Sequence, residues 1–251
     1  MRASTASSLA STRSASRASA LALVFAAAFI VLFLAPPFLP YRFDPYPLIH
    51  WADVFDLATP LVLIPLYWLM LRSAGGPIGA RWNVVFLVFA AAWVEGHGIH
   101  LAANAIGHLL KDQPGPAQDL TEFWDERFGH YLWHSAALGL TALVLVRAAR
   151  SDPAGLPDAT TRGRAWMAIA GAVIYGFALF LIGDEGGTAA LMVAFAAGFL
   201  VAAWPSRGRV LTSPVLTMLA GGYAVALLLF AVWFVYWGGR LPQFSELGWI
   251  K

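Results

Sequence analysis

Long apolar runs alternate with short polar breaks along the whole chain, and this pattern predicts an all-α polytopic membrane protein. A membrane-spanning helix needs about 20 mostly apolar residues, and seven segments of the chain approach or exceed this length. Gly and Pro, which interrupt helices, mark most of the breaks. We therefore predict a transmembrane bundle over residues 20–239, with helices at 21–35, 48–71, 84–110, 123–146, 165–182, 188–204 and 211–237.

Both ends of the chain are predicted to lie outside this bundle. Residues 1–19 are rich in Ser and Ala and are interpreted as a disordered cytoplasmic tail, and residues 240–251 as an extracytoplasmic tail. The run 21–35 could instead be the apolar part of a cleaved signal peptide, which would leave six helices. We expect it to be retained, because no small-residue cleavage site closes it and Pro36 and Pro37 follow directly.

The basic residues predict how the bundle is oriented. Most of the 16 Lys and Arg residues fall in the N-terminal tail and in segments 72–81, 147–164 and 205–209. Cytoplasmic loops carry this excess of positive charge, so the N-terminus is predicted inside and the C-terminus outside. Cleavage of the first segment would not change this orientation. The Arg- and Ala-rich composition suggests the inner membrane of a bacterium.

Composition excludes an ordinary soluble enzyme. Charged residues make up 12% of the chain and hydrophobic residues 59%, whereas a soluble domain carries about 25% charge. The pI of about 9.1 does not indicate a nucleic-acid partner, because the basic residues lie in short loops between apolar runs. Since the chain has no Cys, thiolate metal sites, iron–sulfur clusters and thiol catalysis are excluded.

The fourth predicted helix carries a polar stripe in the outer half of the bundle. Glu126, His130 and His134 recur every fourth residue and therefore share one face of a helix. Two His residues at this spacing can bind a single metal ion. Asp125 points about 100° away from the stripe on an ideal helix and is a separate candidate ligand. Ionisable groups within a membrane cost about 2.5–3.5 kcal/mol each, so this cluster must pair internally, bind an ion or line a wet cavity.

Two other predicted helices face the same region. Helix 84–110 carries several His residues among small residues that allow close helix packing, and Glu95 points roughly opposite to His97. Helix 48–71 begins with His50, Asp53 and Asp56, which form either an ordinary interfacial end or a third wall of the cavity. Asp184 and Glu185 are interpreted as part of a loop. The predicted metal ligands are His97, His100, Asp125, His130 and His134, with Glu95 and Glu126 as catalytic carboxylates.

Imidazole and carboxylate ligands without sulfur suit zinc in a hydrolase or iron in an oxygenase. The leading hypothesis is a membrane-embedded metal-dependent enzyme that acts on a lipid or another amphiphile, because the chain has no soluble domain. One alternative is an electron-transfer protein with haem b held by His100 and His134. Another is a proton-coupled transporter or sensor. Oligomeric state is not predicted.

Seven helices with intramembrane His and Asp resemble, in architecture, the superfamily of alkaline ceramidases and adiponectin receptors. His100 and Asp125 are similar to the first His and the Asp of that superfamily's pattern. The superfamily also carries HxxxH in its last helix, whereas residues 211–237 contain no His and the HxxxH of this chain is His130 to His134. The resemblance is one of architecture, and no functional residue is carried over from it.

Overall fold

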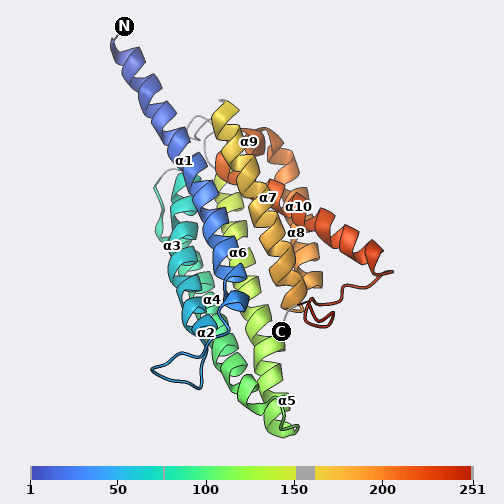
Figure 1. The fold of residues 1–251 in the computed structure, drawn as a ribbon. Helices are drawn as coiled ribbons and strands as arrows, with labels where there is room; N and C mark the ends of the chain where they lie inside the picture. Colours follow the sequence, from blue (N-terminus) through green and yellow to red (C-terminus); the bar gives the residue numbers. More distant parts are fainter. Residues whose placement is uncertain (1, 76, 151–161, 250–251) are drawn as a thin grey trace.

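The structure is a computed structural model that describes residues 2–75, 77–150 and 162–249, and their regular structure is helical. Seven helical segments of the described chain are long and apolar enough to cross a membrane, as predicted. Figure 1 shows them as an elongated bundle, with the N-terminus at one end and the turn between α4 and α5 at the other. This arrangement indicates a multi-pass membrane protein.

The long helices account for most of each span, and short helices join or extend them. The long helices are α1 (Arg2–Leu34), α3 (Ala58–Ser73), α4 (Ala80–Leu110), α6 (His130–Arg150), α7 (Arg162–Glu185), α8 (Ala189–Ala203) and α10 (Pro214–Tyr236). The short elements are η1 (Pro36–Phe38), α2 (Trp51–Asp56), α5 (Pro116–Glu122), the π-helical η2 (Phe123–Gly129), η4 (Trp204–Ser206) and α9 (Arg207–Thr212).

Several helix ends differ from the sequence prediction. Helix α1 begins at Arg2, inside the segment predicted to be disordered, because Ala favours helix and no Gly or Pro precedes Pro36. The fourth span runs continuously from Pro116 to Arg150 and is longer than predicted. The last long helix begins at Pro214 rather than at residue 211, since proline favours the first position of a helix.

The interior between α1, α3, α6 and α7 is apolar around Tyr67 and Tyr175 and is bridged by hydroxyl groups. Tyr67 and Tyr175 are almost completely buried, and the Phe25 ring packs against both. The Tyr67 hydroxyl lies 3.0 Å from Thr141 Oγ1 and 3.4 Å from the Tyr175 hydroxyl. These contacts tie α1, α3, α6 and α7 together without a charged group. The carboxylates and imidazoles gather instead towards the end of the bundle opposite the N-terminus.

The outward faces of the helices carry large exposed apolar side chains. Leu61, Val201 and Val235 are 74%, 74% and 77% exposed. In a water-soluble protein such faces would be covered, because contiguous apolar surface is unfavourable in water. Their exposure is what a lipid-facing surface requires.

Candidate metal centre and its cavity

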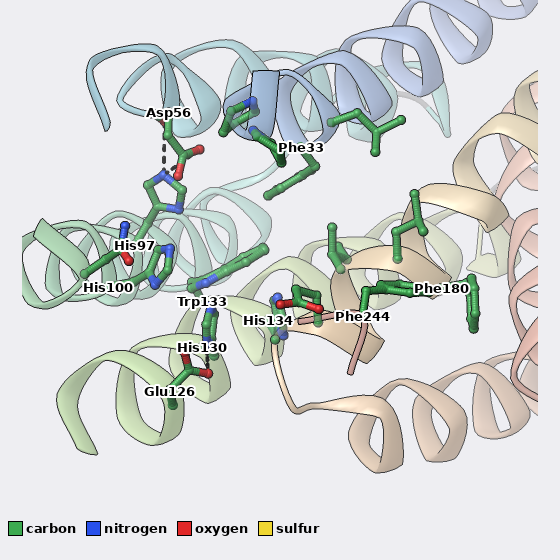
Figure 2. Close-up of a pocket in the computed structure, with 18 of the residues that line it drawn as sticks. Phe33, Asp56, His97, His100, Glu126, His130, Trp133, His134, Phe180 and Phe244 are labelled. Atoms are coloured by element: carbon green, nitrogen blue, oxygen red, sulfur yellow. Dashed lines mark hydrogen bonds and ion pairs between the residues drawn. The ribbon is translucent and has the colours of Figure 1, made fainter. Parts of the chain in front are cut away.

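A cavity of about 760 Å³ lies where α4 and α7 end and α6 begins. Figure 2 shows Asp56, His97 and His100 at one end of this cavity, and Phe180 and Phe244 at the other. The cavity is therefore polar at one end and apolar at the other. Its lining residues are Phe33, Leu34, Pro36, Pro37, Asp56, His97, His100, Asn104, Glu126, His130, Trp133, His134, Phe177, Phe180, Leu181, Ile182, Glu185, Gly186, Trp233, Phe244 and Trp249.

His100, Asp125 and His130 form a compact group of possible metal ligands. One donor atom from each of the three lies within 4.8 Å of the others. The His100 and His130 ring centroids are 4.4 Å apart, and His100 Nδ1 lies 2.5 Å from Asp125 Oδ1. Two imidazoles and a carboxylate are a common donor set for zinc and for non-haem iron. The group can hold one divalent cation, with Asp125 either as a ligand or as the hydrogen-bond acceptor that orients His100.

A π-helical turn brings Asp125 to the same side as His130. The two residues are five positions apart, and on an ideal α-helix they would point in clearly different directions. In η2 the His130 N–H donates to the Asp125 carbonyl oxygen, which is the i→i+5 bond of a π-helix and places these residues one above the other. Gly129 allows the close approach of α4, since a Cβ there would lie 3.1 Å from His100 Cβ.

Carboxylates also lie beside the imidazoles. His130 Nδ1 lies 3.4 Å from Glu126 Oε2, but it has no hydrogen-bond partner among the described residues. His97 Nε2 lies 3.5 Å from Asp56 Oδ1 and 3.1 Å from the Asp56 carbonyl oxygen. Metal-binding His residues usually have one ring nitrogen fixed in this way, which leaves the other nitrogen for the metal. His97 Nδ1 is buried and has no hydrogen-bond partner among the described residues.

His134 is fully buried and stands beside the three-donor group. Its Nδ1 lies 2.6 Å from Thr188 Oγ1, and its ring centroid is 5.6 Å from that of His130. Within the part of the chain that the structure describes, His134 Nε2 has no hydrogen-bond partner. Because a buried polar atom without a partner is unfavourable, this nitrogen marks a position where a ligand can bind.

The structure brings most of the predicted site residues together, with two differences. His100, Asp125 and His130 form the group of possible metal ligands, which we call the ligand group, and His97, His134 and Glu126 line the cavity near it. Helical periodicity predicts Asp125 apart from the stripe of His130 and His134, and η2 is the reason that it joins them. Glu95 is exposed and does not line the cavity, because it lies two residues from the buried His97 and so faces the other side of α4.

The C-terminal segment forms part of the cavity wall, which the sequence did not predict. Glu185, at the end of α7, lines the cavity and holds this segment in place. Ser245 N–H donates to Glu185 Oε2 at 3.1 Å, and Gln243 Nε2 donates to the Glu185 carbonyl oxygen at 3.0 Å. Phe244 and Trp249 thereby reach the cavity from a segment predicted to be a tail. Comparisons with protein-family models, with curated proteins and with solved structures gave no match for the chain.

Proposed function

We propose that this protein is a membrane-embedded, metal-dependent hydrolase that acts on an amphiphile. The observation that carries the proposal is the group of His100, Asp125 and His130 at the polar end of a cavity whose other end is apolar. Three protein ligands leave one coordination position of zinc open, as in catalytic zinc sites. The close spacing of the donor atoms favours a single ion over a haem, which would have to separate two imidazoles.

The side chains around the ligand group suit hydrolysis. A bound divalent cation would polarise a carbonyl group and lower the pKa of a coordinated water to about 7. Glu126 lines the cavity next to His130 and is in position to accept a proton from that water and return it to the leaving group. The reaction forms a bond between the water oxygen and the acyl carbon, breaks the acyl–oxygen or acyl–nitrogen bond, and protonates the leaving group.

An amphiphile fits the two-sided character of the cavity. Its apolar part can contact Phe33 from α1 and Phe177 from α7, while a polar part reaches the imidazoles. Ligand cavities of about 300–1,000 Å³ enclose most of a molecule of drug size. With the N-terminus in the cytoplasm, as the basic residues predict, the cavity would open towards the outer leaflet. The substrate would then come from the membrane itself.

The proposal is tested by measuring fatty-acid release from a panel of amphiphilic esters and amides by the lipid-reconstituted protein. We expect hydrolysis to stop after dialysis against a chelator and to return with zinc. His100→Ala should abolish it, and Glu126→Gln should slow it about 100-fold, the scale of general-base catalysis, without loss of the metal. Glu95→Gln is the matched control, because Glu95 lies outside the cavity.

Three results would contradict hydrolysis by a metal centre. Fatty-acid release that resists chelation, or that is equal in His100→Ala, would show that the ligand group takes no part. Iron in the purified protein with substrate-dependent oxygen consumption would favour an oxygenase. A haem absorption band that is present in the wild type and absent from His100→Ala would favour electron transfer.

A further inference from the structure

The charges that line the cavity are negative. Asp56, Glu126 and Glu185 line it, Asp125 adjoins it beside His100, and no described Lys or Arg is among the lining residues. Four carboxylates exceed the charge of one divalent cation, so the loaded cavity keeps a negative charge when its His residues are neutral. Arg127 lies nearby but lines a separate exposed hollow together with acidic residues. A phosphate or carboxylate group would therefore enter this cavity without a counter-charge.

Glu185 lines the same cavity beside the segment that carries Phe244. Its side chain accepts a hydrogen bond from Ser245 N–H, and no Lys or Arg of the described chain forms an ion pair with it. A carboxylate in partly apolar surroundings attracts a cation more strongly than one in water. Glu185 is thus placed to bind a positively charged group of a ligand.

Aromatic rings cluster in this part of the cavity wall. The centroid of the Trp233 ring lies 5.3 Å from that of Phe244, 5.4 Å from that of Trp249 and 6.0 Å from that of Phe180. All four rings line the cavity, and Trp233 Nε1 donates to the Pro242 carbonyl oxygen at 3.1 Å. Aromatic faces attract cations, and groups of such rings bind quaternary ammonium ligands.

His134 connects this part of the cavity to the ligand group. Its ring neighbours that of His130, and a Cβ added at Gly186, the residue after Glu185, would lie 2.8 Å from His134 Cε1. Its buried Nε2, which has no partner among the described residues, gives a ligand a further hydrogen-bond position between the two. One elongated molecule can therefore contact Glu185, His134 and the ligand group together.

We infer that Glu185 and the rings of Phe180, Trp233, Phe244 and Trp249 bind the ammonium group of a cationic, long-chain amphiphile. The inference rests on the proposed function in one respect only, that this cavity is the substrate site. The inference specifies that the substrate is positively charged. The substrate would be a long-chain amine or ammonium compound with a hydrolysable bond near the His residues.

The test uses three probes that share a twelve-carbon chain and have no hydrolysable acyl bond: dodecyltrimethylammonium, dodecanol and dodecyl sulfate. Binding is measured with the zinc-loaded and metal-free protein in phosphatidylcholine nanodiscs, after subtraction of binding to empty nanodiscs. We expect the ammonium probe to bind about tenfold more tightly than dodecanol, as expected for a charge-assisted contact with added cation–π attraction. Dodecyl sulfate should show no saturable binding.

Variants assign this preference to named groups. Glu185→Gln removes the charge but keeps an oxygen that can accept from Ser245 N–H, so the fold should survive. It should weaken binding of the ammonium probe about tenfold and leave the affinity for dodecanol unchanged. Trp249→Leu keeps an apolar side chain and should weaken only the ammonium probe, about threefold. Glu95→Gln removes a carboxylate outside the cavity and should change neither affinity.

Equal affinity for all three probes, or equal effects of Glu185→Gln and Glu95→Gln, would overturn the inference and leave an apolar-chain site only. Tighter binding of dodecyl sulfate than of the ammonium probe would overturn the inference as well. Because the probes are not hydrolysed, these outcomes are independent of whether the protein is a hydrolase. If the protein prefers the ammonium probe but shows no metal-dependent fatty-acid release, the proposed reaction alone would be refuted.

Discussion

Gly96 offers a direct way to disturb the candidate metal centre without changing any of its ligands. It lies on α4 beside His97, where α4 packs against α6. A Cβ at this position would lie 2.7 Å from the Trp133 backbone nitrogen and 3.0 Å from Leu132 Cβ. Since non-bonded carbon contacts are about 3.5–4.0 Å, Gly96→Ala must push the two helices apart by roughly 0.5 Å. Gly98→Ala is the matched control, because a Cβ there meets nothing within 4 Å.

The displacement is large compared with the tolerance of a metal site. His100 lies on α4 and His130 begins α6, so separation of the helices spreads donor atoms whose distances to a metal must hold within about 0.2 Å. We expect Gly96→Ala to weaken zinc binding about 10–100-fold, as when the orientation of ligands is disturbed. Overpacking costs about 1–3 kcal/mol, whereas replacing a helical glycine by alanine contributes about 1 kcal/mol. Gly96→Ala should therefore be about 1–3 kcal/mol less stable than Gly98→Ala.

Zinc affinity is measured by competition with a chromophoric chelator, and stability by thermal unfolding in the same detergent. We expect Gly98→Ala to bind zinc like the wild type and to unfold at the same or a slightly higher temperature. If the two alanine variants bind zinc equally and unfold together, then close contact of α4 and α6 does not position the ligands.

Three further substitutions probe single contacts of the site. Asp125→Asn should lower zinc affinity about 10–100-fold in the same competition assay, and a loss of equal size in the exposed Asp119→Asn would show that Asp125 has no special role. Gly186→Ala places a Cβ 2.8 Å from His134 Cε1 and only 3.5 Å from His130 Cδ2, so we expect about tenfold lower kcat/KM of fatty-acid release with unchanged zinc content. Loss of zinc from Gly186→Ala would instead mean that the substitution also displaces the metal ligands. Thr188→Val removes the partner of His134 Nδ1 and should destabilise the fold by about 1–3 kcal/mol in thermal unfolding. Thr188→Ser, which keeps the hydroxyl, should restore most of that loss, and equal effects of the two would exclude this hydrogen bond as the cause.

The spans and the polar end of the bundle could be predicted from the sequence because both depend on local pattern. A run of apolar residues predicts a span by its length alone. The i, i+4 spacing of Glu126, His130 and His134 predicts one helical face, and all three line the cavity. The positions of the helix ends were less predictable, since terminal turns fray and the last hydrogen bonds of a helix depend on its surroundings.

Two parts of the site depend on information that no local pattern carries. The position of Asp125 is set by the π-helical turn of η2, and α-helical periodicity applied to the sequence places it on another face. Glu95 lies deep in its predicted helix, which suggested a catalytic carboxylate. Whether a residue of α4 faces the cavity depends on how α4 packs against the other helices, and the sequence pattern does not contain that information. Phe244 and Trp249 reach the cavity through contacts of their segment with Glu185 and Trp233.

The proposed function requires that His100, Asp125 and His130 bind a divalent cation. The most direct measurement is the metal content of the purified protein, by elemental analysis after preparation without chelators. We compare the wild type with His100→Ala/His130→Ala and with His50→Ala/His108→Ala, whose rings contact each other outside the cavity. We expect about one zinc or iron ion per chain in the wild type and in the His50/His108 variant, and none in the His100/His130 variant. Absence of metal from the wild type, or equal metal in all three proteins, would contradict the proposed function.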